Sequence, residues 1–277
     1  CLLAHVMEQT SRARFKTKQR VEETQDRVET VLSNLMPKKV LEEIKLSPGL
    51  GKSHAYDHAT IAQSDLCGFT QLASDKSPEE VVSFVEDLFG RFDRLTDEFH
   101  IYKVETVGDA YIAGMAEHTL TSENSPIKVV QFGMAMIKAT AEWAESLGVK
   151  VTCRVGVHHG HCVGGVVGKG MQRYHLFGSF MSELDTLEAT SREGITQISR
   201  ACKDAIVKEH LQHLGDQRAS LTDSAALEKL QKEFSGAIER SDLKLTTSKG
   251  EEHDYSEVGG RTFLIYKDKA EAANSAS

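Results

Sequence analysis

Paired cysteines are missing from this sequence. Its five cysteines, Cys1, Cys67, Cys153, Cys162 and Cys202, form an odd and scattered set. Their spacing matches neither a disulfide framework nor a paired metal-binding motif. We therefore expect reduced thiols in a cytosolic compartment.

Long apolar runs are missing as well. No stretch approaches the length of a membrane-spanning helix, and no secretory signal is evident. The sequence begins Cys-Leu-Leu-Ala without Met, so we expect a piece cut from a longer protein. These apolar residues could end a preceding membrane helix or merely mark a boundary.

An excess of basic residues is also absent. The 277 residues include 33 Lys and Arg against 41 Asp and Glu, which gives a formal net charge of −8. This balance disfavours nucleic acid or an anionic membrane as the main partner. The length fits one domain of ordinary size with room for extra segments.

Two carboxylates stand at the centre of the most informative stretch, residues 58–116. The apolar run at 59–62 predicts a buried strand that delivers Asp65 at its end. Two β-prone runs flank the Gly-Asp pair that contains Asp109, which predicts a hairpin. Two carboxylates at strand ends can converge on one hard cation, because Mg²⁺ is typically held by one or two carboxylates plus substrate phosphates.

Small residues follow the first of these carboxylates. Cys67 and Gly68 would leave the backbone amides after Asp65 free to approach a phosphate. The residues thus indicate a nucleotide and metal site. The alternative is that each Asp only serves a turn or caps a strand end, as Asp commonly does.

Five segments carry a resemblance to a known family. Ser-Asp-Leu-Cys-Gly-Phe-Thr at 64–70 and Tyr-Lys-Val-Glu-Thr-Val-Gly-Asp-Ala-Tyr at 102–111 resemble the catalytic domain of class III nucleotidyl cyclases. Further matches are Arg-Val-Gly-Val-His at 154–158, Gly-Gly-Val-Val-Gly at 164–168 and Arg-Tyr-His-Leu-Phe-Gly at 173–178. The resemblance covers about residues 32–203. It implies a ferredoxin-like α+β fold, a mainly antiparallel sheet with packed helices.

The resemblance also implies a reaction and its metal ligands. A ribose 3′-hydroxyl attacks its own α-phosphate, which yields a 3′,5′-cyclic nucleotide and pyrophosphate. Asp65 and Asp109 match the family's aspartates for two Mg²⁺ or Mn²⁺ ions, and the Leu66 carbonyl is a further expected ligand. Amides near Phe69 and Thr70 would hold phosphate oxygens.

An arginine completes this half of the expected site. Arg154 matches the residue that contacts the phosphates, and a guanidinium fork suits that role. The alternative is a strand arginine in a surface ion pair.

Choice of base depends on Glu105 and His175. Glu105 matches the guanylyl type, because a carboxylate accepts the N–H donors of guanine and would repel adenine. His175 stands where guanylyl types carry Cys and adenylyl types carry Asp. A neutral imidazole could still hydrogen-bond guanine O6. GTP is therefore the favoured substrate.

Three residues that the family uses in the transition state are missing. The expected Asn and Arg positions hold Ser182 and Thr186, and Ser-Glu-Val-Gly-Gly at 256–260 replaces an expected Lys. Losing one such charge-stabilising donor costs on the order of 10²–10³ in rate.

This loss bears on the expected assembly. Because the family's sites form between head-to-tail subunits, we expect a heterodimer in which this chain supplies the metal half and a partner supplies Asn, Arg and Lys. Glu105 and His175 would then face the second, degenerate site, and residues of the partner would recognise the base of the substrate in the active site.

Two other functions compete with this one. A catalytically inactive regulatory pseudocyclase is disfavoured because Asp65, Asp109 and Arg154 are all retained, and an adenylyl cyclase is disfavoured by Glu105. The His-His-Gly-His-Cys run at 158–162 could suggest zinc, but neighbouring strand residues point to opposite faces and would not converge.

The expected domains are a signalling or coiled-coil helix with its linker at 1–45, a catalytic domain at 46–269 with an insertion at about 204–256, and a disordered tail at 270–277. The helical segment, about 10–35, carries an apolar seam of only about two heptads, so a solvated connecting helix is equally compatible. The resemblance favours a dimerising helix, as in membrane-linked and soluble guanylyl cyclases. It implies a cytoplasmic domain under an upstream receptor or rhodopsin-like membrane domain.

Local signals place further elements. Ser77 begins a capping box before one helix, and Ser125-Pro126 begins another. Strands are expected at 150–157 and 262–266, with a Gly-rich segment from 158 to 170. Inside the expected insertion we predict a helix around 227–238 and a loop at 246–253.

Overall fold

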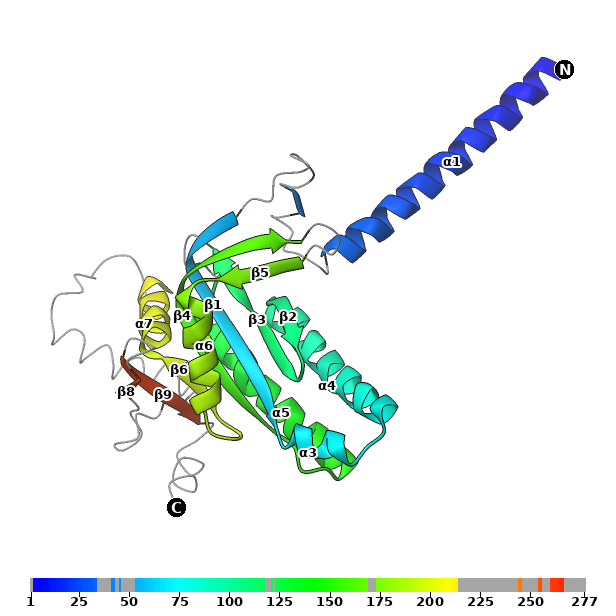
Figure 1. Cartoon of the computed structure of the whole chain (residues 1–277). Helices are drawn as coiled ribbons and strands as arrows, with labels where there is room; N and C mark the ends of the chain where they lie inside the picture. The colour runs from blue at the N-terminus through cyan, green and yellow to red at the C-terminus, as the bar shows by residue number, and fades with distance from the viewer. Residues whose placement is uncertain are drawn as a thin grey trace. The chain divides into compact units, whose positions relative to one another are not determined.

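A computed structural model of the chain describes residues 2–33, 41–42, 45, 53–117, 121, 123–168, 173–213, 244–245, 254–255 and 260–266 (Figure 1). It forms two compact units, one made of residues 1–52 and 165–174 and the other of residues 53–164 and 175–277. The predicted helix near 227–238, the loop at 246–253 and the tail at 270–277 lie outside the described residues.

The first unit contains one long helix, α1 (Leu2–Ser33), so the predicted helix exists and begins earlier than expected. Val21 and Val28 of the apolar seam are exposed. Pairs one turn apart, such as Arg12 with Glu8 at 2.6 Å between Nη2 and Oε1, lie along its surface. Coiled-coil pairing stays a prediction. Within the described part of the chain, no helix is long and apolar enough to cross a bilayer.

The second unit is built on a sheet with the strand order β2-β3-β1-β4-β6-β9-β7, with β5 paired to β4 and β8 paired to β9. The strands are β1 (Ser53–Cys67), β2 (Tyr102–Val107), β3 (Ala110–Glu117), β4 (Thr152–Val167), β5 (Arg173–Phe177), β6 (Thr196–Ser199), β7 (Lys244–Leu245), β8 (Asp254–Tyr255) and β9 (Gly260–Tyr266). The β4–β6 pair is parallel, whereas β1–β3, β2–β3, β6–β9, β7–β9 and β8–β9 are antiparallel. The expected α+β fold with a mainly antiparallel sheet is confirmed.

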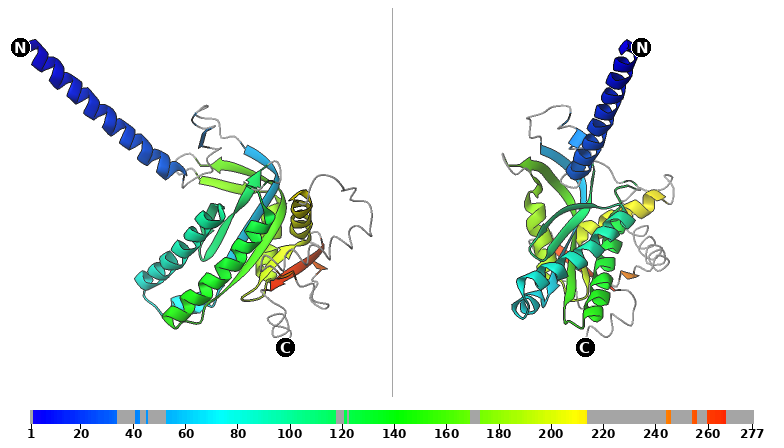
Figure 2. Two further views of the ribbon diagram at one scale, coloured as in Figure 1. Left: turned by 180° about the vertical axis from the view of Figure 1, so that it is seen from behind. Right: turned by 90° about the vertical axis from the view of Figure 1, so that its right-hand side faces the viewer.

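Helices cover both faces of this sheet. They are α3 (Phe69–Ser74), α4 (Pro78–Phe99), α5 (Pro126–Leu147), α6 (Ser179–Thr190) and α7 (Arg200–His213). A Cβ added to Gly133 of α5 would meet the Val155 side chain, whereas one added to Gly156 would meet the backbone of α6 at Leu187 and Glu188. Because neighbouring strand residues point to opposite faces, α5 and α6 lie on opposite sides of β4 (Figure 2).

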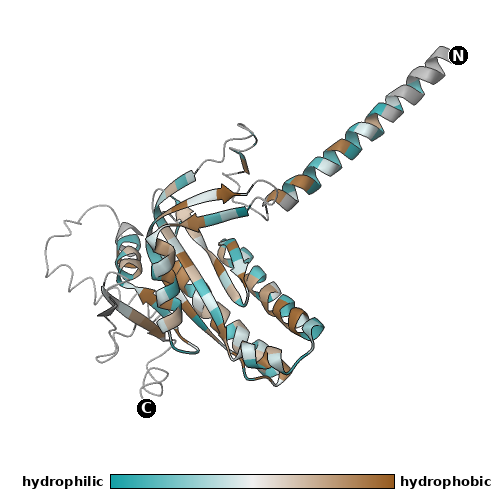
Figure 3. Cartoon of the chain, in the orientation of Figure 1, coloured by the Kyte–Doolittle hydropathy of each residue, from teal (hydrophilic) through white to brown (hydrophobic). Residues whose placement is uncertain are grey.

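Helix α4 begins and packs as its sequence predicts. Ser77 Oγ accepts the Glu80 amide while the Glu80 carboxylate accepts the Ser77 amide, which is a complete capping box. The helical spacing of the apolar residues predicts one buried face, made of Val81, Val85, Leu88, Phe92, Leu95 and Phe99. Leu88 and Phe92 of this face are fully buried, and hydrophobic and hydrophilic stretches alternate along the helix (Figure 3). The helix ends at Phe99, and the backbone of its C-cap residue, His100, is left-handed.

Two predictions need correction. The spacing of Val130, Met134, Ile137 and Ala141 predicts the buried stripe of α5, but only Val130 is fully buried, Met134 and Ile137 are partly buried, and Ala141 is exposed. Phe132, Met136 and Trp143 are the large side chains that α5 buries completely. Strand β4 continues to Val167, past the predicted end at Val157. Strand pairing, which a local pattern cannot supply, keeps its glycines extended.

Candidate functional site

The chain turns sharply just after Asp65. Strand β1 ends at Cys67, Gly68 adopts a left-handed φ of 84°, and α3 begins at Phe69. A Cβ on Gly68 would lie 2.8 Å from the Lys150 carbonyl oxygen. Glycine is therefore required at this position by both its backbone conformation and the space available.

The predicted hairpin around Asp109 is present. Val107 pairs with Ala110, so Gly108 and Asp109 form a two-residue turn, with Gly108 at φ 63°. Strand β3 also pairs with β1. The end of β1 that carries Asp65 therefore lies beside the turn that carries Asp109.

Arg154 of β4 connects this strand end to helix α6. Its Nη2 lies 2.9 Å from Asp65 Oδ2, and its Nε lies 2.6 Å from Glu188 Oε1. Burial raises the pKa of Asp109, the charge of Asp65 raises it further, and the charge of Arg154 opposes the change. The three predicted residues Asp65, Asp109 and Arg154 thus lie within one electrostatic cluster.

Glu188 was not predicted. The residue as a whole is 8 % exposed, and burial raises the pKa of its carboxyl group although Arg154 acts in the opposite direction. The sequence held one signal for it, because Glu188 continues the buried helical spacing of Phe180 and Leu184. A carboxylate at an apolar position of a helix indicates a partner inside the fold.

Charge and donor chemistry suit a hard divalent cation at this cluster. Asp65, Asp109 and Glu188 outnumber the single guanidinium of Arg154, so the cluster is negative in sum. In the described ranges, no three His, Cys, Asp or Glu side chains are placed to hold a metal ion together. A pair of carboxylates fits Mg²⁺ or Mn²⁺, whose other ligands would come from a triphosphate.

The two predicted base-reading residues contact each other. His175 Nδ1 of β5 lies 3.1 Å from Glu105 Oε2 of β2, and both side chains are partly exposed. This contact leaves His175 Nε2 as the ring nitrogen available to a ligand. In a neutral ring that donates from Nδ1, Nε2 is an acceptor, so donation to guanine O6 needs the doubly protonated ring.

Ser182 and Thr186 lie on α6, on the same helix as Glu188. The Thr186 hydroxyl donates to the Ser182 carbonyl oxygen at 2.9 Å. Neither side chain carries a charge that could neutralise a phosphate. Residues 256–259, where a Lys was expected, lie outside the described residues.

Two histidines of β4, His158 and His159, are buried inside the fold, whereas His161 is exposed. His158 contacts Ser199 Oγ through Nδ1 and Glu183 Oε2 through Nε2, each at 3.0 Å. His159 Nδ1 contacts Thr60 Oγ1 at 2.8 Å. Burial lowers the pKa of His158 to about 4 and that of His159 to about 3. These neighbouring rings therefore bind different partners from different elements.

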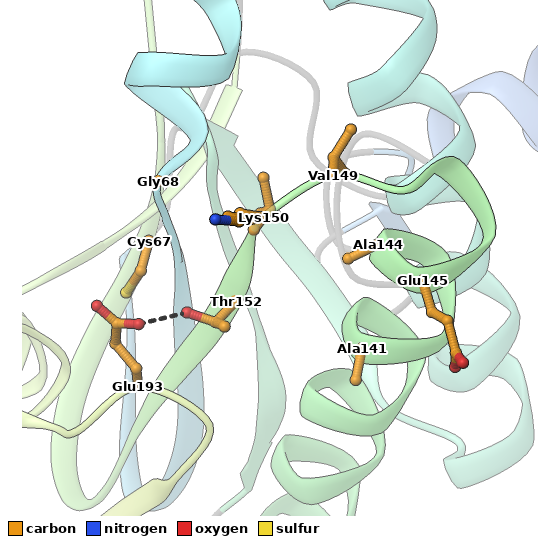
Figure 4. A pocket seen from close by; sticks show the side chains of 10 residues that line it. Cys67, Gly68, Ala141, Ala144, Glu145, Val149, Lys150, Thr152 and Glu193 are labelled. Atoms are coloured by element: carbon orange, nitrogen blue, oxygen red, sulfur yellow. Dashed lines mark hydrogen bonds between the residues drawn. The ribbon is translucent and has the colours of Figure 1, made fainter.

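A separate cavity of about 440 Å³ opens between the end of β1, the start of β4 and the last turns of α5 (Figure 4). It is lined by Cys67, Gly68, Ala141, Ala144, Glu145, Val149, Lys150, Val151, Thr152 and Glu193. Asp65, Asp109 and Arg154 are not among its lining residues.

Comparison with known proteins identifies the family. The family described as "Adenylate and Guanylate cyclase catalytic domain" matches residues 52–222. Guanylate cyclase alpha of Plasmodium falciparum is 30% identical over 210 residues, 73% of this chain and 5% of that protein. The receptor-type guanylate cyclase gcy-23 of Caenorhabditis elegans is 33% identical over 190 residues, 68% of this chain and 18% of that protein.

A solved structure shares the fold. The dimeric guanylyl cyclase domain of the RhoGC fusion protein from the fungus Blastocladiella emersonii aligns with a TM-score of 0.55 and 18% identity, over 78% of this chain and 97% of that one. The chain spans at most about a fifth of the length of the curated relatives described above. From the family match and the shared fold, we conclude that this chain belongs to the family of adenylate and guanylate cyclase catalytic domains.

Proposed function

We propose that this chain is the metal-binding subunit of a heterodimeric guanylyl cyclase, which converts GTP to cyclic GMP and pyrophosphate. The observation that carries the proposal is the gathering of Asp65, Asp109 and Arg154 at one strand end, while α6 carries Ser182 and Thr186. The names of the relatives, which are guanylate cyclases, support GTP as the substrate.

Asp65 and Asp109 would hold two Mg²⁺ or Mn²⁺ ions, with the Leu66 carbonyl oxygen as a further ligand. When bound, such ions activate the attacking 3′-hydroxyl and neutralise charge on the triphosphate. The backbone amides from Cys67 to Thr70 would bind phosphate oxygens, because the left-handed Gly68 brings the chain around at the strand end.

Arg154 would bind the phosphates, and Glu188 would hold it in place. The Glu188 carboxylate accepts a hydrogen bond from Arg154 Nε, which fixes the plane of the guanidinium. The terminal nitrogen Nη2, which contacts Asp65 at 2.9 Å, would then be offered to the triphosphate.

A partner chain would complete the site. It would supply the Asn that orients the ribose and the Arg and Lys that meet charge developing on the phosphates. In this arrangement Glu105 and His175 would face the second, degenerate site. At any site where Glu105 contacts the base, its carboxylate favours guanine over adenine, which supports GTP over ATP.

The N-terminal segment would connect the domain to its regulator. We propose that residues 1–45 form a dimerising helix and linker, and that residues 46–269 form the catalytic domain. Exposed Val21 and Val28 on α1 support pairing of this helix. The receptor-type relatives support a cytoplasmic domain under a membrane receptor.

Complementing variants of the same chain test the proposal. Wild-type chain with Mn²⁺ and GTP should yield little cyclic GMP by itself. A second copy with Ser182→Asn and Thr186→Arg, inactivated as a metal subunit by Asp65→Ala, should raise the rate on the order of 10²-fold when mixed with the wild type. Strong cyclic GMP production by the wild-type chain alone would overturn the heterodimer.

Two controls separate the alternatives. A mixture in which both copies carry Asp65→Ala should be inactive, because no metal half remains. If that mixture, or a natural partner combined with the Asp65→Ala chain, stays fully active, the chain is a regulatory module and not the metal subunit. Replacing GTP by ATP in the active mixture reports the choice of base.

A further inference from the structure

One carboxylate on α4 contacts both strands of the hairpin that carries Asp109. Asp93 Oδ1 accepts a hydrogen bond from Lys103 Nζ of β2 at 2.7 Å and another from the Tyr111 hydroxyl of β3 at 2.6 Å. The Lys103 ammonium also lies 4.9 Å from the centroid of the Tyr111 ring. The three side chains join one helix and two strands.

Among the described residues, few contacts support the tip of this hairpin beyond the pair that Glu105 forms with His175. A Cβ built on Gly108 meets no described atom within 4 Å, and Val107 is 60% exposed. The register between β2 and β3 shifts between Lys103 and Glu105, so the ladder is irregular below the turn. The position of the turn therefore depends on contacts made further along the two strands.

The Tyr111 side chain packs the hairpin against helix α4. Its ring is fully buried and contacts Phe89 and Phe92 of α4, each with 5.3 Å between ring centroids. In the β1–β3 pairing Tyr111 is opposite Ser64, the residue before Asp65. Tyr111 is thus two residues from Asp109 and across the sheet from the strand end that carries Asp65.

The Asp93–Lys103 ion pair by itself contributes little. Half of the Asp93 side chain is exposed, and such pairs are weak in water. The hydroxyl of a fully buried ring is different, because it needs an acceptor and Asp93 provides one at 2.6 Å.

We propose that Tyr111 and its acceptor Asp93 are positioning residues, which hold the β2–β3 hairpin where Asp109 and Asp65 can bind the same divalent ions. This inference rests on the proposed function of the two aspartates. Removing a group that orients a metal ligand typically lowers metal affinity 10- to 100-fold, and we expect the lower end because the contact is one residue removed from the turn.

Binding of Mn²⁺ to the full chain tests the inference. Free Mn²⁺ is measured by electron paramagnetic resonance, with a non-hydrolysable GTP analogue present at saturation. Tyr111→Phe removes the hydroxyl and should weaken Mn²⁺ binding about tenfold. Asp93→Asn keeps an acceptor oxygen but loses its charge, so it should weaken Mn²⁺ binding less than Tyr111→Phe does. The double variant should bind no more weakly than Tyr111→Phe alone, because that variant already lacks the hydroxyl that Asp93 accepts.

A matched control is available on the same helix. Asp87 of α4 has a similarly exposed side chain and pairs with Arg91 at 3.5 Å. Asp87→Asn makes the same change of charge without a contact to the hairpin among those described, so it should leave Mn²⁺ binding unchanged. Lys103→Arg should retain wild-type affinity as the conservative variant.

The outcomes are distinguishable. If the wild-type chain binds no Mn²⁺, both the proposed function and this inference fail. If Asp65→Ala abolishes binding but Tyr111→Phe and Asp93→Asn bind as the wild type does, only the inference fails. Should Asp93→Asn unfold, Tyr111→Phe decides the matter, since it keeps the ring and removes one oxygen atom.

Discussion

Replacing Glu188 by Gln would test whether Glu188 holds Arg154 in place for phosphate binding. The Arg154–Glu188 contact is the shortest in the carboxylate cluster, 2.6 Å between Nε and Oε1, and the Glu188 side chain is 11% exposed. Glutamine keeps an acceptor for Nε but removes the charge. A hydrogen bond to a charged group contributes about 1.5–3 kcal/mol, against about 1 kcal/mol for a neutral one.

The expected loss follows from that difference. Gln also avoids burying a carboxylate, which offsets part of the cost, so we expect the free energy of unfolding to fall by about 1 kcal/mol. Among the described residues, Asp65 would remain as the acidic partner of Arg154, and the guanidinium would compete more strongly with Mn²⁺ for it. Binding of Mn²⁺ with a non-hydrolysable GTP analogue should weaken roughly five- to tenfold.

Calorimetric titration of the full chain measures this binding, and urea unfolding measures stability. Glu183→Gln is the matched control, because Glu183 lies on the same helix but contacts His158 instead of Arg154. Its binding of Mn²⁺ and nucleotide should stay near wild type. Equal binding by the Glu188→Gln and wild-type chains, or an equal loss in both variants, would show that Glu188 does not prepare Arg154.

Further predictions concern stability, each measured by urea unfolding. Burial lowers the pKa of His158 to about 4, so as pH falls the unfolded chain binds a proton before the folded chain does. The free energy of unfolding therefore decreases as pH drops from about 6.5 towards 4. His158→Gln should remove about 2 kcal/mol of the stability that the wild type loses between pH 7 and pH 5. Gly68→Ala should cost at least about 2 kcal/mol, because φ is left-handed and the new Cβ meets the Lys150 carbonyl oxygen. Gly156→Ala should cost about 3 kcal/mol or more, because its Cβ would press on the α6 backbone at Glu188. If the stability of His158→Gln depends on pH as that of the wild type does, the prediction for His158 is wrong. If either glycine variant is as stable as the wild type, the prediction for that glycine is wrong.

Several features could be predicted from sequence because neighbouring residues determine them. The capping box at Ser77 involves Glu80, three residues away, and it formed as predicted. The Gly-Asp pair at 108–109 formed the two-residue turn that its flanking runs indicated. The last strand, β9, also appeared where a short apolar run predicted it. The capping box and the turn depend on interactions within a few residues along the chain, whereas β9 follows a local apolar pattern and is completed by pairing with the distant strand β6.

Tertiary structure decided what distant elements share. Glu188 meets Arg154 across 34 positions of sequence, and His175 meets Glu105 across 70, so no local pattern could pair them. The extension of β4 to Val167 depends on pairing with other strands. Sequence therefore determined the ends of helices and turns, whose hydrogen bonds are local. Packing determined which charges meet, because burying a charged group requires a partner that only the assembled fold can bring to it.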